Sequence, residues 1–493
     1  MNFLLNFNQW IIFSIFLFTI IGLVGFSGYL LNKFKINENT TRKIVHIGVG
    51  LLASTSAFLF RNSLPAILLA TIFIILNWIA LIQDKAKGMH SIERKSNGTV
   101  YFPISFLLLI LIYWYKNPAI LIIGMLLMSL SDPLASFVGE SKFGGKSFVL
   151  WNDKKSIGGT SAAFLSNFFI VYLLFPFLNN TKILIPDLLL IALIVAVIGT
   201  LAEIISSKGT DNLTLPVISA LMLDLAVTSD RSGKYTILMW IIFSFVFATI
   251  AWKARSLSVS GAFGAIFMGS IIFSIGGYIW AMPMMVFFLL SSLVSKIGKK
   301  QKYSAHLMSE KGATRDIYQV YANGGTGLIC SIIWFYTNND IFYFAYLASL
   351  AAATADTWAT EIGILLGKSP RNITTFQKVL PGESGGITIP GTIAAVFGAL
   401  AIGITALIFT EFMNYEIFII IIIAGVGGAL VDSLLGATIQ AQYKCPNCNK
   451  ITEKLVHCEN HHTVLIKGIR WINNDFVNFI CTASGALFCI LGI

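Results

Sequence analysis

Charged side chains are scarce in this sequence, because Asp, Glu, Lys and Arg make up only 12% of its 493 residues. A soluble globular chain carries about 25%. Together with a 56% share of hydrophobic residues, this shortage excludes an ordinary soluble protein. The chain also lacks the alternating segments of about ten residues that form membrane β-barrels. The sequence therefore predicts an all-α polytopic membrane protein that is surrounded by membrane lipid.

Cysteine is rare as well, and its placement does not indicate a disulfide scaffold. Of the six cysteines, Cys330, Cys481 and Cys489 lie in apolar runs, and the other three lie in one polar loop. Basic residues are absent before Lys33, so the first apolar run, residues 11–31, has no basic n-region of a signal peptide. We interpret this run as a retained first transmembrane helix whose N-terminus lies outside the cytoplasm.

Apolar runs of about 20 residues predict about sixteen transmembrane helices. The loops between them are alternately charged and short, and one side of the membrane would carry all but five of the 34 Lys and Arg residues. The positive-inside rule makes that side cytoplasmic, so both termini are predicted on the non-cytoplasmic side. The same rule accounts for the net charge of +11, so we expect no nucleic-acid partner. The five Lys and Arg residues that are predicted on the other, non-cytoplasmic side are Arg61, Lys116, Lys182, Arg231 and Lys234.

Two short motifs occur in the same order in both halves of the chain. The pattern D-x-x-A-[ST]-x-[IV]-G occupies residues 132–139 and 356–363, and G-T-x-A-A begins at Gly159 and Gly391. Small residues are common where membrane helices meet, so each match alone is weak. Their shared order predicts a duplication into halves of about eight helices each, which are parallel repeats because eight is even. The predicted domains are residues 1–252 and 253–493.

Polar residues in the first half gather at predicted cytoplasmic helix ends. Asp132 ends one apolar run, Glu203 lies near the end of another, and Asp211 opens the next. Acidic groups at membrane depth are costly and usually functional, although helix capping or a buried ion pair is the alternative. Carboxylates bind Mg²⁺ and lysines neutralise phosphate, so we predict a site for a phosphate-bearing substrate. The other candidates are His46, Arg42, Lys43, Lys146, Lys154, Lys155 and Asn212.

The second half repeats this arrangement with more amide side chains. Asp356 and Asp432 lie within apolar runs, and a glycine-rich stretch at residues 381–386 could bring backbone N–H groups close to a phosphate. A purely structural polar network is the alternative, since polar groups in lipid need internal partners. The other candidates are Arg315, Asn323, Glu361, Lys368, Arg371, Lys378, Gly385, Gly386, Asn474, Asp475 and Asn478.

The predicted cytoplasmic loop at residues 441–474 has the spacing of a metal site. Cys445-Pro-Asn-Cys448 is followed, after nine intervening residues, by Cys458-Glu-Asn-His461. A C-x₂-C…C-x₂-H pattern is typical of structural zinc, and reduced cysteines are the alternative. Either His457 or His462 could replace His461. Four protein ligands leave no open position, so this zinc would be structural.

Several short stretches in each half match the motifs of known families. They are residues 42–46, 131–139, 154–160 and 211–216 in the first half, and 322–325, 355–363, 381–386, 432–437 and 474–478 in the second. On these stretches, residues 40–225 resemble the polyprenol kinase family, which includes dolichol kinase and phytol kinase and is akin to the CDP-diglyceride synthases. That resemblance implies phosphorylation of a long isoprenoid alcohol, typically with CTP. Residues 255–490 resemble the phytyl-phosphate kinases, a family that includes transmembrane protein 19, which implies addition of a second phosphate.

Together the resemblances imply a fused, bifunctional salvage kinase that converts a phytol- or geranylgeraniol-type alcohol to its monophosphate and then to the diphosphate. CTP or another nucleoside triphosphate would be the donor, with Mg²⁺ held by Asp132 and Asp211 and by Asp356 and Asp432. His46 or Glu203 would act near the alcohol. The alternatives are a CTP-dependent lipid cytidylyltransferase and a lipid or isoprenoid-phosphate transporter.

Overall fold

The computed structural model describes residues 8–82, 97–151, 153–179, 182–298, 314–410, 413–458 and 461–493. Most of these residues are helical, and the few short strands lie in loops between helices. Eleven of the described helices are long and apolar enough to cross a membrane. The fold is therefore that of an all-α polytopic membrane protein, as the composition predicts. The count of about sixteen spanning helices remains a prediction.

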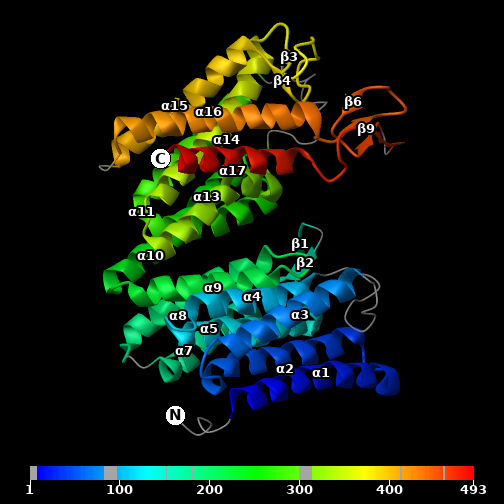
Figure 1. Ribbon diagram of the computed structural model, residues 1–493, viewed down its shortest axis with the longest axis vertical. Helices are drawn as coiled ribbons and strands as arrows, with labels where there is room; N and C mark the ends of the chain where they lie inside the picture. The colour runs from blue at the N-terminus through cyan, green and yellow to red at the C-terminus, as the bar shows by residue number, and fades with distance from the viewer. Residues whose placement is uncertain are drawn as a thin grey trace. The chain divides into compact units, whose positions relative to one another are not determined.

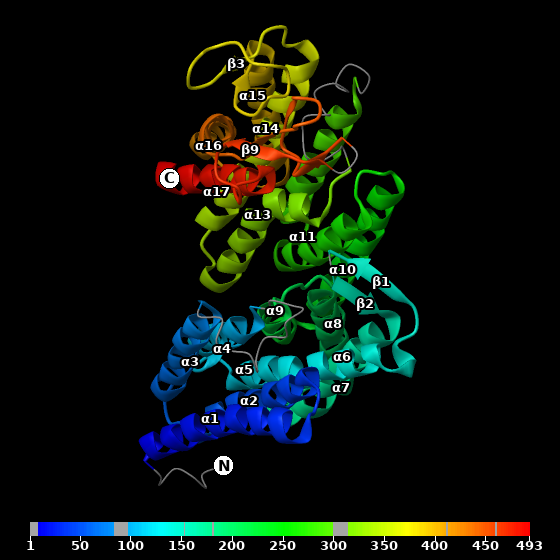
Figure 2. The same cartoon turned by 90° about the vertical axis from the view of Figure 1, so that its right-hand side faces the viewer.

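The chain divides into two compact units, Met1–Leu238 and Met239–Ile493, each of which is a helical bundle with its own core (Figures 1 and 2). In unit 1 the centre is formed by α5, α8 and α9, where Ile123, Ile194 and Leu223 are completely buried. The elements of unit 1 are α1 (Gln9–Phe34), α2 (Glu38–Leu59), α3 (Leu64–Ile82), α4 (Gly98–Tyr113), α5 (Pro118–Leu126), the π-helical turn η1 (Leu127–Ser131), α6 (Asp132–Glu140), the 3₁₀ turn η2 (Lys142–Gly144), β1 (Ser147–Leu150), β2 (Asp153–Ser156), α7 (Ile157–Leu178), α8 (Ile185–Ile204), α9 (Asp211–Thr228) and the start of α10 (Arg231–Lys253).

Unit 2 is built around α14, which contacts α11, α13, α15, α16 and α17. Small residues permit this packing, since a Cβ added to Gly425 would lie 2.7 Å from the Cβ of Ala351 on α14. The 38-residue α11 is kinked at Gly277, which has a positive φ of 62° and separates two helices. The remaining elements are α11 (Val259–Lys296), α13 (Ile317–Thr337), α14 (Ile341–Leu366), β3 (Arg371–Asn372), β4 (Gly386–Ile387), α15 (Ile389–Phe409), α16 (Tyr415–Thr438), β5 (Gln442–Lys444), β6 (Ile451–Thr452), β7 (Val456–His457), β8 (His461–His462), β9 (Val464–Lys467) and α17 (Asn474–Gly492).

The two motifs shared by the halves pack against each other in the same way in each unit. A Cβ added to Gly159 would lie 2.8 Å from the carbonyl oxygen of Ala135, and one added to Gly391 would lie 2.7 Å from that of Ala359. Each glycine also donates its N–H to the hydroxyl that caps its helix, at 3.2 Å in unit 1 and 3.1 Å in unit 2. A pair of antiparallel strands precedes the capped helix in both units, as the hairpin β1–β2 in unit 1 and as β3–β4, joined by a longer loop, in unit 2. These matching contacts support the predicted duplication.

Substituting either repeated glycine should destabilise its unit. We expect Gly159→Ala and Gly391→Ala to lower the free energy of unfolding by about 1–3 kcal/mol, because the new Cβ would overlap backbone that cannot move aside cheaply. Gly25→Ala in α1 is the matched control, since its Cβ would meet nothing within 4 Å. Thermal unfolding midpoints in detergent would test this, and equal midpoints for Gly159→Ala and Gly25→Ala would contradict it.

Candidate functional site

In unit 1, Asp132 and His46 come together at a distortion of the helix. Asp132 is the first residue of α6 and directly follows the π-helical turn η1. His46 of α2 places its Nε2 3.1 Å from the carbonyl oxygen of Met128 and 4.0 Å from Oδ2 of Asp132. A carbonyl oxygen only accepts hydrogen bonds, so Nε2 carries the proton and donates it to Met128. Such π-helical turns occur frequently at functional sites.

Lys155, on the β1–β2 hairpin, lies close to Asp132. Lys155 on β2 places Nζ 2.5 Å from Oε1 of Glu203 and 2.9 Å from its carbonyl oxygen. Burial lowers the pKa of Lys155, but Glu203 and Asp211 raise it further, so the net pKa lies above its ordinary value and the ammonium remains charged. Asp132 interacts electrostatically with Asp211, Glu203 and Lys155. The structure therefore brings three carboxylates, one lysine and one histidine into a single cluster.

The other residues predicted in unit 1 lie around this cluster. Arg42 is exposed but close enough to interact electrostatically with Asp132. Lys43 instead pairs with Glu140 at 3.2 Å. Lys146 is exposed just before β1, and Lys154 is exposed on β2, where the alternation of side chains along a strand puts it on the opposite face from Lys155. Asn212 follows Asp211, and its backbone N–H donates to Oδ1 of that carboxylate at 2.9 Å.

In unit 2, a cavity of about 280 Å³ lies among α13, α14, α16, α17 and the loop at residues 381–386. Most of the residues predicted for this half line it. Those residues are Arg315, Asn323, Asp356, Glu361, Gly385, Gly386, Asp432, Asn474 and Asn478. Four predicted residues are absent from the lining: Lys368, Arg371, Lys378 and Asp475.

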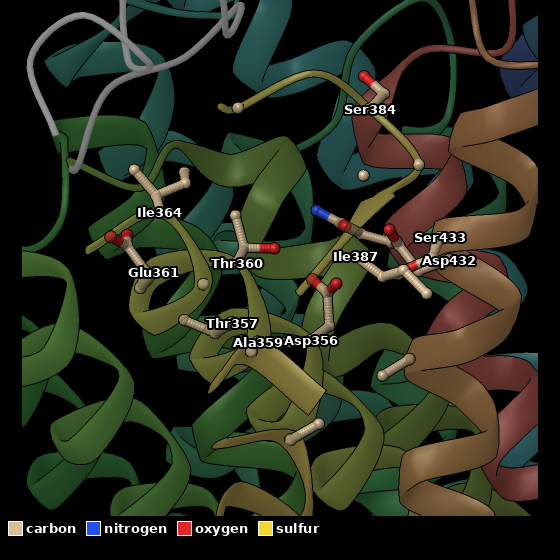
Figure 3. A pocket seen from close by; sticks show the side chains of 18 of the residues that line it. Asp356, Thr357, Ala359, Thr360, Glu361, Ile364, Ser384, Ile387, Asp432 and Ser433 are labelled. Atoms are coloured by element: carbon tan, nitrogen blue, oxygen red, sulfur yellow. The ribbon is translucent and has the colours of Figure 1, made fainter. Parts of the chain in front are cut away.

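Two carboxylates from different helices meet in this cavity. Figure 3 shows Asp356 of α14 beside Asp432 of α16, with Glu361 set apart from them beyond Thr360. The carboxyl groups of Asp356 and Asp432 lie within hydrogen-bonding reach of each other. Oδ2 of Asp432 is buried and has no hydrogen-bond partner within the part of the chain that the structure describes. A close pair of buried carboxylates requires a proton or a cation, and this oxygen donor set fits Mg²⁺.

Of the basic residues predicted in unit 2, Arg315 lines the cavity, whereas Lys368, Arg371 and Lys378 do not. Arg315 lies just before α13 at the edge of the cavity, and its guanidinium carbon lies 5.4 Å and 5.5 Å from the ring centroids of Phe287 and Phe288. Burial lowers the pKa of Arg315 to about 10, which still leaves it cationic at neutral pH. Arg371 donates a hydrogen bond to the carbonyl oxygen of Phe376 at 3.0 Å on the exposed loop. Arg315 is therefore the cation best placed to meet a phosphate in the cavity.

The cysteine loop supplies a cavity residue that the sequence did not single out. Oε1 of Glu453 accepts hydrogen bonds from Oγ of Ser384 at 2.6 Å and from Nε2 of Gln440 at 2.8 Å. Glu453 also interacts electrostatically with Asp432. It joins the glycine-rich loop to the end of α16, and Thr357 and Thr360 add further unpredicted lining. The one sequence feature that could have indicated Glu453 is its place, as an acidic residue, in the predicted zinc-binding loop at residues 441–474.

The three clustered cysteines come together with a histidine, and that histidine is His457. The ligand atoms of Cys445, Cys448, His457 and Cys458 all lie within 4.8 Å of one another. His461 is exposed on β8 and belongs to no such group among the described residues, so the structure selects one of the alternatives left open by the spacing. The backbone N–H of Cys448 donates to the Cys445 sulfur and lowers the pKa of that thiol to about 6. Hydrogen bonding to Cys448 raises the pKa of Cys458 to about 11.

These features define a multi-pass helical membrane protein with a polar, carboxylate-rich site inside each unit. Residues 242–486 match the family described as integral membrane protein DUF92, and the chain belongs to this family. An uncharacterized membrane protein of Methanocaldococcus jannaschii is 33% identical over 246 residues, which cover 50% of this chain and 90% of the relative. No solved structure matches the chain.

Two further relatives each match somewhat less than half of the chain. The phytol kinase of Synechocystis sp. is 31% identical over 209 residues, covering 41% of this chain and 87% of the relative. Protein VTE6 of Arabidopsis thaliana is 21% identical over 240 residues, covering 48% of this chain and 65% of the relative. Phytol is an isoprenoid alcohol, so the chain is related to kinases of that substrate class.

Proposed function

We propose that the protein is a bifunctional isoprenoid kinase, in which unit 1 phosphorylates a long-chain alcohol and unit 2 adds a second phosphate to the product. One observation carries the proposal: each unit gathers carboxylates on helices that follow one another in the same order. Asp132 begins α6, Glu203 ends α8 and Asp211 begins α9. In unit 2, Asp356 lies within α14, Asp432 lies within α16, and Asn474 begins α17. The relationship to a phytol kinase supports the substrate class.

In unit 1, we assign Asp132 and Asp211 to Mg²⁺ and nucleotide. Bound Mg²⁺ would neutralise charge on the phosphates, which is the principal requirement of phosphoryl transfer. Lys155 adds a positive charge beside them. Glu203 already forms an ion pair with Lys155, so His46 is the better candidate to receive the proton of the alcohol. Because Nε2 of His46 donates to Met128, the lone pair of the ring is on Nδ1, which is where the proton would go.

In unit 2, Asp356 and Asp432 would hold Mg²⁺ and Arg315 would bind a phosphate of the substrate or nucleotide. The glycine-rich loop can bring backbone N–H groups to the phosphates, since Gly385 has a positive φ of 82° and packs against the backbone of Ala437 on α16. A Cβ at Gly385 would lie 2.4 Å from the Ala437 nitrogen, so only glycine permits this approach. We propose CTP or another nucleoside triphosphate as the donor.

The decisive experiment supplies the purified full chain, in lipid vesicles with Mg²⁺, with CTP labelled at either the γ- or the α-phosphate. With phytol or geranylgeraniol, γ-label should appear in the lipid monophosphate and then in the diphosphate, and chelation of Mg²⁺ should abolish both reversibly. Transfer of the α-label to lipid would instead show cytidylyl transfer and overturn the proposal. Movement of an isoprenoid phosphate across the vesicle without any label transfer would indicate a transporter.

A further inference from the structure

The segment from β5 to β9 has too little apolar core to hold its own fold. Its strands pair as β6-β5-β9 and β7-β8, with only two to four residues in each. Its aliphatic side chains are largely exposed: Leu455 is 49%, Ile466 48% and Val464 60% exposed. Modules of this size generally need a disulfide or a metal ion to fold. All the cysteines that the structure describes are free thiols, so a metal ion is the available stabiliser.

The backbone presents the four ligand atoms to one point. Cys445 and Cys448 lie on a tight turn, in which Asn449 donates its N–H to the carbonyl oxygen of Cys445 at 2.9 Å and takes a positive φ of 57°. The end of β7 brings in the second pair, with Nδ1 of His457 3.1 Å from Sγ of Cys458 and 3.5 Å from Sγ of Cys448. Tetrahedral zinc, with bonds of about 2.0–2.3 Å, keeps its ligand atoms at similar separations.

We propose that Cys445, Cys448, His457 and Cys458 bind a structural zinc ion, and that this ion fixes the position of Glu453 in the wall of the unit 2 cavity. Three thiolates and one imidazole form a borderline-soft, tetrahedral donor set that selects zinc over Mg²⁺. Glu453 lies between Cys448 and His457 in the chain, so both flanks of its segment are held by ligands of the same ion.

Through Glu453, the zinc-binding segment from β5 to β9 would fix the position of the glycine-rich loop at residues 381–386, which lies far from it in the sequence. Glu453 accepts hydrogen bonds from Ser384 of the glycine-rich loop and from Gln440 just beyond α16. Loss of zinc would release Glu453 and, through it, the glycine-rich loop that lines the cavity. Glu453 is therefore a positioning residue. The zinc site stands independently of the proposed function, and only the effect on the second phosphorylation rests on it.

The metal site is tested by measuring zinc in the purified full chain by elemental analysis, after expression with zinc in the medium. We expect one zinc ion per chain in the wild type, and loss of zinc in Cys448→Ser and His457→Ala. His461→Ala is the matched control, because His461 lies four residues away on the paired strand and should be dispensable. A wild type without zinc would overturn the site, as would retention of zinc in His457→Ala together with its loss in His461→Ala.

The positioning role is tested by hydrogen exchange, which requires no activity. Zinc removal and Glu453→Gln should both increase exchange at residues 381–386, and only zinc removal should also increase it across residues 442–458. Glu453→Gln should keep its zinc and slow the second phosphorylation about tenfold, with the first unchanged, because a charge-assisted contact is weakened. Unchanged exchange at residues 381–386 in both cases would overturn the positioning role. A wild type that binds zinc but transfers no phosphate would refute the proposed function alone.

Discussion

Replacement of Asp356 by asparagine is expected to slow the conversion of isoprenoid monophosphate to diphosphate by roughly 100-fold or more. Asparagine keeps the shape of the side chain but removes the charge that, beside Asp432, would hold Mg²⁺. Phosphorylation of the alcohol should continue at its normal rate, because its cluster belongs to the other unit. Separate assays of the two steps, supplied with alcohol or with monophosphate, would measure both effects.

The same helix provides the control for this variant. Asp340→Asn removes a carboxylate that is exposed at the opposite end of α14, about 24 Å away by the rise of a helix, where it accepts a hydrogen bond from Trp334. It should leave both steps unchanged. Asp432→Asn should resemble Asp356→Asn, and the double variant should lose little more, since two ligands of one ion act as a unit. A folded Asp356→Asn protein that lost both steps would refute the two-site proposal.

Asp132→Asn is expected to have the reverse effect, with alcohol phosphorylation reduced by roughly 100-fold or more and the second step preserved. Asp132 interacts with both Asp211 and Lys155, so the loss of its charge alters the whole cluster and not one contact alone. In the assay that begins with the alcohol, neither the monophosphate nor the diphosphate should accumulate. Supplying the monophosphate directly should restore formation of the diphosphate.

Asp187→Asn is the matched control for unit 1. Asp187 lies in the first turn of α8, with Glu203 about 24 Å away at the other end, and forms an exposed ion pair with Arg231 at 2.8 Å. Exposed pairs contribute at most about 1 kcal/mol, so both activities should survive. If Asp187→Asn reduced alcohol phosphorylation as strongly as Asp132→Asn, the assignment of the site to the α6, α8 and α9 ends would be wrong.

The sequence predicted the parts of the protein that depend on local pattern. Apolar run length is sufficient to predict the helical membrane fold, because a span has to satisfy its own backbone. The repeated motifs around Asp132 and Asp356 predicted a duplication, and the matching contacts of Gly159 and Gly391 support it. Acidic residues in apolar runs also indicated which helices carry the clustered polar groups. Whether these groups perform catalysis remains a prediction.

Other features depend on three-dimensional arrangement and were not accessible from spacing. Lys154 and Lys155 are equivalent in sequence, and only the register of β2 directs Lys155 to Glu203. His457 and His461 both fit a zinc pattern, and only the β7–β8 pairing decides between them. Glu453 reaches the cavity because the fold of its loop carries it there. Its place in the sequence, between Cys448 and His457, gives no hint of the contact with Ser384.

The π-helical turn before Asp132 sets the rotation of the preceding helix relative to the motif. A π-helical turn accommodates one residue more than an α-helical turn. The matching helix of the second half, α14, is α-helical throughout from Ile341 to Leu366. The helix that leads into Asp132 therefore holds one residue more than an uninterrupted α-helix of the same length, whereas α14 does not. Without that extra residue, everything preceding Asp132 in its helix would be rotated by about 100° relative to the motif.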